Sequence, residues 1–144
     1  MIDVLVSSVV PAEIGRVWAV VRDFNAMPSW HPLIAQSRIE TGAPSDQIGC
    51  VRNFSLTDGA RIREQLLSLS DREYEFSYRI LDADVPLQNY SAGLQLFRVT
   101  DNETTYGRWW AKFDAPPGQE DELAAMVANE VFQAGFDALK ARFA

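Results

Sequence analysis

Three side chains of this sequence could do chemistry: His31, Arg52 and Glu64. His31 is the only histidine, and imidazole ordinarily titrates closest to neutral pH, so this ring could contact a ligand or transfer a proton. The alternative is a structural role, in which the ring is hydrogen-bonded to backbone and fixes the turn between Trp30 and Pro32. We expect no metal site, because there is no second histidine to share one.

Arg52 and Glu64 become neighbours in one of two strand registers. A three-residue turn at 57–59, with its glycine left-handed, places Arg52 opposite Glu64 and Phe54 opposite Ile62. A two-residue turn shifts this pairing by one and puts Arg52 on the other face. We prefer the first register because it pairs apolar with apolar residues and opposite charges with each other. The pair would then be either an ion pair joining two strands or a polar anchor for a ligand.

The first third of the chain predicts a strand followed by two short helices. Residues 2–10 are rich in β-branched side chains and predict the strand. We expect the first helix to have Pro11 at its first position, where its missing N–H costs nothing. A second, short helix within 23–30 is cut off by prolines. The apolar stripe of the first helix follows helical spacing and consists of Ile14, Val17, Trp18 and Val21.

The remainder predicts six antiparallel strands and one long helix. Turn residues divide the strands at about 33–41, 49–57, 60–70, 73–81, 90–100 and 104–114. In the last strand we expect Trp109 to point inward and Trp110 to be partly exposed, because the face of Trp110 carries two cations. The final helix covers about 25 residues after Pro117 and is acidic at its start and basic near its end, which complements the helix dipole. Its predicted stripe is Leu123, Met126, Val127, Val131, Ala134 and Ala138, widened by Phe132, Phe136 and Leu139.

The composition sets limits on the function. The 144 residues suit a single domain over 1–144, with 47% hydrophobic and 23% charged residues. A net charge of −7 argues against a nucleic-acid or anionic-membrane partner, since phosphates need a basic face. Cys50 is the only cysteine, so no intrachain disulfide is expected. No secretion signal or membrane-spanning run is evident, so we expect a cytoplasmic protein without membrane insertion.

The order of these elements, together with several short motifs, resembles the helix-grip fold of the START-like (SRPBCC) superfamily. The similarity is strongest to its bacterial polyketide cyclase/dehydrase-like branch. It implies an α+β fold like that of the birch pollen allergen, in which a curved seven-stranded antiparallel sheet wraps around a long C-terminal helix. The motifs are Pro11 with Val17-Trp18, Asp23-Phe24, Trp30-His31-Pro32, Gly49-x-Val51-Arg52, Asp58-Gly59-x-x-Ile62-x-Glu64, Tyr90, Trp109-x-Ala111-x-Phe113-Asp114 and Gly135-Phe136-x-x-Leu139-Lys140.

The resemblance also implies an internal cavity between the sheet and the final helix. We expect His31 at its rim and the Arg52–Glu64 pair deeper inside, among apolar and aromatic walls typical of small-molecule pockets. Core packing is the alternative role for the aromatic residues. The predicted ligand-binding residues are Trp30, His31, Arg52, Phe54, Glu64, Tyr78, Tyr90, Trp109, Phe113 and Met126, and Leu94 and Val127 are further lining candidates.

Three functions fit these features. The favoured one is binding of a hydrophobic or aromatic small molecule, lipid- or polyketide-like, with no cofactor. The second is a cyclase or dehydratase in which Glu64 is the base, Arg52 stabilises an enolate, and His31 or a tyrosine is the acid. The third is a protein-interaction module, which would require an exposed apolar patch. The sequence leaves open the ligand's identity and whether the chain forms a homodimer.

Overall fold

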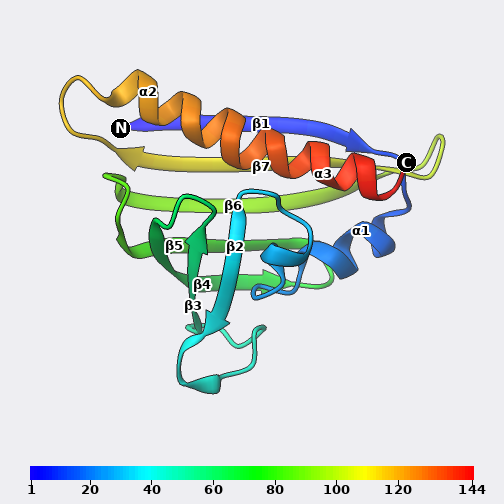
Figure 1. The fold of residues 1–144 in the computed structure, drawn as a ribbon. Coiled ribbons are helices and arrows are strands. Elements are labelled where there is room, and N and C mark those ends of the chain that lie inside the picture. Colours follow the sequence, from blue (N-terminus) through cyan, green and yellow to red (C-terminus); the bar gives the residue numbers. More distant parts are fainter.

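A computed structural model describes residues 1–144 and has one seven-stranded antiparallel sheet in the order β1-β7-β6-β5-β4-β3-β2. Helices lie on one face of this sheet, and β2 and β3 run steeply across the direction of β1 and β7 (Figure 1). The strands are β1 Ile2–Val10, β2 Ile34–Ile39, β3 Val51–Leu56, β4 Arg61–Ser70, β5 Glu75–Ala83, β6 Gln88–Val99 and β7 Thr104–Asp114. The helices are α1 Ile14–Val21, η1 Met27–Ser29, η2 Glu40–Gly42, α2 Glu120–Ala125, η3 Met126–Gln133 and α3 Ala134–Arg142.

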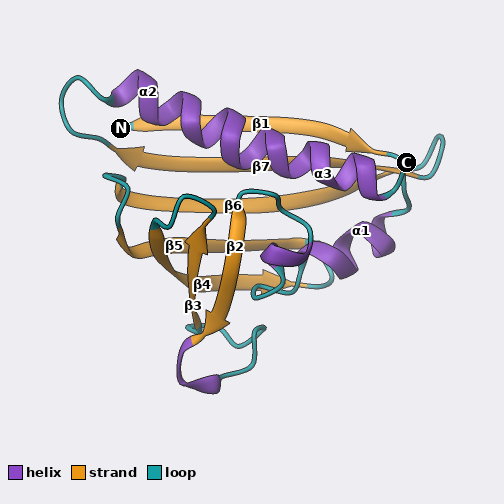
Figure 2. Ribbon diagram, viewed as in Figure 1, coloured by secondary structure: helices purple, strands orange, loops and turns teal.

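The predicted α+β helix-grip architecture is confirmed. The long C-terminal helix runs along β1 and β7, while α1 contacts β6 and β7 and η1 contacts β2 (Figure 2). The first strand occupies the predicted residues 2–10, and the other six strands lie within a few residues of their predicted positions. No helix is long and apolar enough to cross a membrane.

The preferred register of β3 and β4 is also confirmed. Arg52 is paired with Glu64, and Phe54 with Ile62. The connecting turn spans 57–59, and its Gly59 has φ 93°, a left-handed conformation that few other residues adopt. Side chains alternate between the two faces of a strand, so this register places Arg52 and Glu64 together on the buried face.

The predicted start of α1 at Pro11 is wrong. The helix begins at Ile14, and the carboxylate of Glu13 accepts a 3.0 Å hydrogen bond from the backbone N–H of Gly15. This acidic N-cap satisfies a backbone donor at the helix start, which a proline three residues upstream cannot do. The predicted apolar face is nevertheless the buried one, as expected from its spacing.

The C-terminal helix departs from the regular helix that we expected. Its middle part, η3, is a π-helix, whose backbone bonds span one residue more than those of an α-helix. The wider turn rotates the following residues relative to a 3.6-residue period. As a result Phe132, Phe136 and Leu139 are fully buried, whereas Val131 and Ala134 of the predicted stripe are only half-buried.

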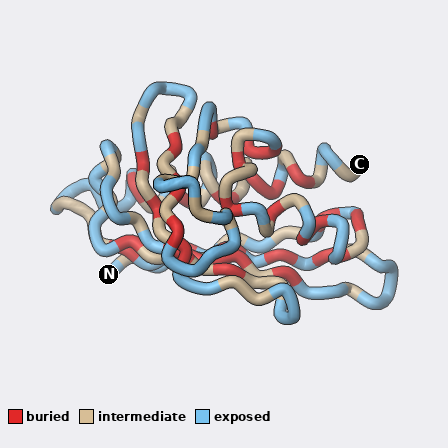
Figure 3. Tube along the Cα trace, turned by 90° about the horizontal axis from the view of Figure 1, so that it is seen from below, coloured by how far each residue is buried: buried red, intermediate tan, exposed pale blue.

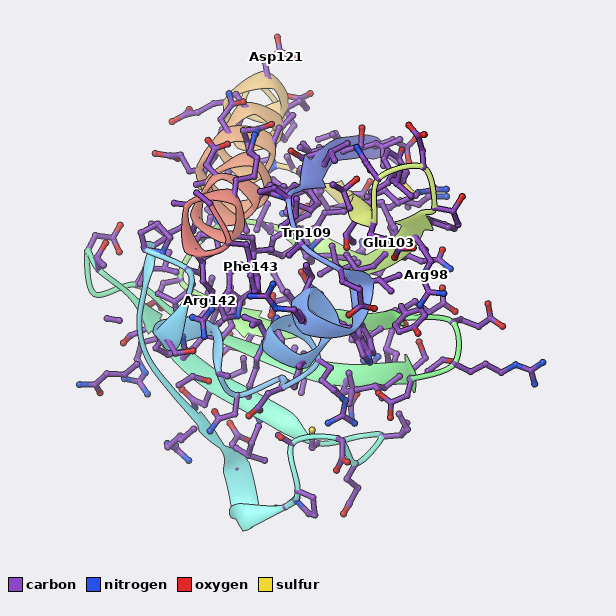
Figure 4. The ribbon with its side chains drawn as sticks, turned by 90° about the vertical axis from the view of Figure 1, so that its right-hand side faces the viewer. Arg98, Glu103, Trp109, Asp121, Arg142 and Phe143 are labelled. Atoms are coloured by element: carbon purple, nitrogen blue, oxygen red, sulfur yellow. The ribbon has the colours of Figure 1, made fainter.

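The core lies between the helices and the concave face of the sheet, where the buried segments of the chain gather (Figure 3). Trp109 of β7 is close to its centre, beneath the C-terminal helix (Figure 4). The ring of Phe132 stacks on it with a centroid distance of 4.6 Å, and that of Phe136 meets it edge-on at 6.0 Å. As predicted, Trp109 is buried and Trp110 is partly exposed.

Candidate functional site

The Arg52–Glu64 pair is buried and closely bonded. The Nε and Nη2 atoms of Arg52 donate to Oε1 of Glu64 at 2.9 and 2.6 Å, and Nη1 donates to the backbone carbonyl of Phe24 at 3.0 Å. The guanidinium carbon lies 3.9 Å from the ring centroid of Phe24 and 4.9 Å from that of Tyr78. Each nitrogen of Arg52 therefore has a protein acceptor, and aromatic rings cover the cation.

Glu64 differs from Arg52 because one of its carboxylate oxygens has no hydrogen-bond donor in the protein. Both hydrogen bonds from Arg52 end on Oε1, no protein donor contacts Oε2, and the residue lines a pocket. Burial raises the pKa of the Glu64 carboxyl above its ordinary value, while the charge and hydrogen bonds of Arg52 act in the opposite direction. The geometry thus turns an acceptor, rather than a cation, toward the pocket.

This apolar pocket lies between the sheet and η3. Fourteen of its fifteen lining residues are hydrophobic, and its cavity volume is about 50 Å³. That volume holds about one or two water molecules, so a larger ligand requires the walls to move. The lining residues are Met27, Leu33, Ile34, Phe54, Leu56, Ile62, Glu64, Tyr78, Ile80, Val85, Leu87, Tyr90, Met126, Val127 and Val131.

Two tyrosines supply the other polar side-chain oxygens among the lining residues. The hydroxyl of Tyr78 accepts a 3.0 Å hydrogen bond from Nε1 of Trp109, so its own proton remains available to an acceptor. Burial raises the pKa of Tyr78 and Tyr90, and the charge of Glu64 raises both further. Both phenols are therefore neutral hydrogen-bonding groups close to the carboxylate.

His31 is not the rim residue that we expected. It is 1% exposed and does not line the pocket. Its Nε2 lies 2.7 Å from the carbonyl oxygen of Val131, and its Nδ1 accepts a 3.1 Å hydrogen bond from the backbone N–H of Leu33. The proton is thus on Nε2, and burial lowers the pKa of the ring. The geometry fits the structural alternative, in which the ring joins the loop after η1 to the π-helical segment.

The predicted ligand-binding residues divide into two groups. Phe54, Glu64, Tyr78, Tyr90 and Met126 line the pocket, as does Val127. Arg52 lies behind Glu64, and the other predicted residues pack in the core without reaching the pocket. Contact of any of them with a ligand stays a prediction. The residues that do not line the pocket are Trp30, His31, Arg52, Leu94, Trp109 and Phe113.

Most of the aliphatic walls of the pocket were not predicted from the sequence. Alternation along β3 and β4 placed Ile62 inward and could have identified it, because it faces Phe54 across the two strands. Leu33 and Val85 lie in connections between elements, where no periodic pattern marks a side chain as inward. No group of three metal-binding side chains is present in the structure.

The fold and site together define a helix-grip protein with a small apolar pocket under its C-terminal helix. The chain belongs to the family described as "Polyketide cyclase / dehydrase and lipid transport", which matches residues 1–144. The predicted family membership is thereby confirmed.

Similar proteins come from plants and bacteria. The abscisic acid receptor PYL10 of Arabidopsis thaliana is 27% identical over 135 residues, which cover 90% of this chain and 73% of the receptor. The structure of XoxI from Bacillus cereus superposes with a TM-score of 0.89 at 26% identity, covering 99% of this chain and 96% of that one. A structure from Thermobifida fusca has a TM-score of 0.87 at 28% identity and covers 99% and 93%.

Proposed function

We propose that this protein binds a small, mainly apolar molecule in the apolar pocket. The observation that carries the proposal is a pocket with fourteen hydrophobic lining residues and one carboxylate whose second oxygen has no protein partner. A binding site for a small apolar ligand has this composition, in which apolar burial supplies affinity and a few polar groups supply orientation. The family description and the small-molecule receptor among the relatives point the same way.

The test is a titration with toluene, monitored through the methyl resonances of protein carrying ¹³C-labelled Ile, Leu and Val methyls. We expect shifts at pocket methyls such as those of Ile34, Leu56 and Val127, and at few others. Leu56→Trp should fill the pocket and abolish these shifts. The control is Leu67→Trp, which makes the same change at an exposed position outside the pocket and should leave them intact. Shifts confined to other sites would refute the proposal.

An enzyme of the cyclase or dehydratase kind is a second candidate, favoured by the raised pKa of Glu64 in an apolar pocket. Glu64 could act as a base and Tyr90 as an acid within the same pocket. The roles first considered for His31 and Arg52 have no geometric support, because neither residue lines the pocket. Glu64→Gln should abolish turnover of any substrate found for the protein.

The interaction-module alternative is supported by a row of exposed apolar side chains on the outer face of the sheet. Leu5 pairs with Trp110 and Val9 with Tyr106, which also pairs with Phe97. Leu5 and Val9 are 60% and 50% exposed. Such a patch is a feature of interaction surfaces.

A further inference from the structure

The polar end of the apolar pocket restricts which ligands it can accept. We propose, building on the function above, that the pocket selects small apolar molecules carrying a hydroxyl, which donates to Oε2 of Glu64, and that it rejects carboxylates. The inference names the ligand class for the same site and follows from the different positions of Arg52 and Glu64.

The guanidinium of Arg52 is not accessible from the pocket. All three nitrogens of Arg52 already donate to Glu64 or to the carbonyl of Phe24, and the residue is 2% exposed. The rings of Phe24, Phe54 and Tyr78 lie within 3.9 to 5.4 Å of its guanidinium carbon. A ligand carboxylate would have to break these bonds before it could pair with the arginine.

The carboxylate of Glu64, in contrast, faces the pocket. A second carboxylate placed there would meet a like charge in surroundings that screen it poorly, and it would also lose its hydration. A hydroxyl would instead donate a charge-assisted hydrogen bond to Oε2, which has no protein donor. The acceptor therefore favours donor-bearing ligands and disfavours anions.

The two tyrosines of the pocket can donate hydrogen bonds to a ligand. Tyr78 and Tyr90 line the pocket, and both lie near enough to Glu64 for its charge to affect them. The hydroxyl of Tyr78 receives its hydrogen bond from Trp109 and so has a proton left to donate. A ligand hydroxyl can both donate to Glu64 and accept from a phenol, whereas an ammonium group can only donate. The set of groups thus matches an alcohol or a phenol best.

The size of the pocket also restricts its ligands. The open volume of about 50 Å³ is smaller than the roughly 150 Å³ of an engineered apolar cavity that holds benzene. A single ring therefore requires the wall to move and enlarge the pocket. Met126 is the wall residue suited to this, because its unbranched side chain adapts easily and is only half-buried.

The experiment compares four probes of similar size: phenol, toluene, anisole and benzoate. Each is titrated at pH 7 and monitored at the pocket methyls. We expect phenol to bind at least about tenfold more tightly than toluene or anisole, as one hydrogen bond to a charged group would provide, and benzoate to cause no shifts. Equal affinities for phenol and toluene, or binding of benzoate as tight as that of phenol, would overturn the inference.

A double variant tests the source of the selectivity. Arg52→Met with Glu64→Leu replaces the ion pair by apolar side chains without leaving a lone buried charge, an exchange that other proteins tolerate. This variant should still bind toluene and should lose the preference for phenol; a preference that persists would contradict the role of Glu64. Glu40→Gln, a change in a half-buried ion pair outside the pocket, is the control and should keep the preference.

The two proposals can fail separately. If toluene binds in the pocket but phenol binds no better, the proposed function stands and the selectivity is wrong. If none of the four probes shifts the pocket methyls of the wild-type protein, the proposed function is wrong and the selectivity falls with it. The wild-type series alone decides both questions, even if the double variant does not fold.

Discussion

The space beneath the C-terminal helix is filled in one region and partly open in the next. In the filled region, Trp109 stacks on Phe132 and is bordered by Phe136 and His31. A methyl group added at Gly135 would lie 2.7 Å from the Trp109 ring, closer than real contacts allow. In the apolar pocket the walls are mostly aliphatic, and about 50 Å³ remains open.

The π-helical segment η3 divides these two regions. Val131 lines the apolar pocket, while Phe132, the next residue, is fully buried against Trp109. The carbonyl of Val131 is also the acceptor facing His31, so the position of this pocket wall is set from the filled region. The open space therefore depends on the rigid aromatic packing beside it, because close-packed side chains transmit position from one region to another.

The largest difference should appear when a side chain is removed from each region. Phe132→Ala deletes a ring with no exposed surface and should lower the free energy of unfolding by about 4 kcal/mol. Met126→Ala trims a half-buried wall of the pocket and should cost about 1 kcal/mol, since less packed surface is lost. Urea unfolding of both variants measures the contrast. Similar losses would show that the two regions are packed alike.

A somewhat smaller effect is expected from breaking the buried ion pair. Glu64→Leu leaves Arg52 as an uncompensated buried charge and should cost about 3 kcal/mol. The double variant with Arg52→Met should recover most of that loss. The half-buried, bidentate pair of Arg63 with Glu40 on the outer face is the comparison, with a 2.7 Å contact between Nε and Oε2, and Glu40→Gln should cost much less than Glu64→Leu. A double variant no more stable than Glu64→Leu would contradict the account.

The positions of the polar residues at the apolar pocket could be predicted from local rules. Opposite charges and apolar residues match across 50–66 in only one register, and the turn glycine permits it, so the inward position of Arg52 and Glu64 followed from the sequence. What could not be predicted was which of them faces the pocket. That depends on the carbonyl of Phe24, which the fold brings to Arg52 from the connection between α1 and η1, 28 residues earlier.

The filled region was less predictable, for a different reason. A π-helix has no distinctive residue pattern, so the stripe of the final helix was drawn with a 3.6-residue period and placed Val131 rather than Phe132 at its centre. The burial of His31 depends on Val131, which is 100 residues away in sequence. No local signal reveals a partner at that distance, and a lone histidine near a proline therefore looked like a rim residue.

The smallest expected effect is a pH dependence that originates in the filled region. Burial lowers the pKa of His31 in the folded chain, the nearby charge of Arg52 acts in the same direction, and the carbonyl of Val131 opposes them. Above the unfolded value of about 6.5 the ring is neutral in both states and has no effect. As the pH falls below that value, the unfolded chain takes up a proton that the folded chain resists, so the free energy of unfolding decreases until the folded pKa is reached.

His31→Gln isolates this contribution, because an amide keeps an N–H donor for Val131 and does not titrate. Urea unfolding at pH 7.5, 6.5 and 5.5 should show a steeper loss of stability for the wild-type protein than for the variant. The raised pKa of Glu64 affects both proteins equally and cancels in the difference. Parallel losses would mean that His31 is protonated as easily in the folded chain as in the unfolded one.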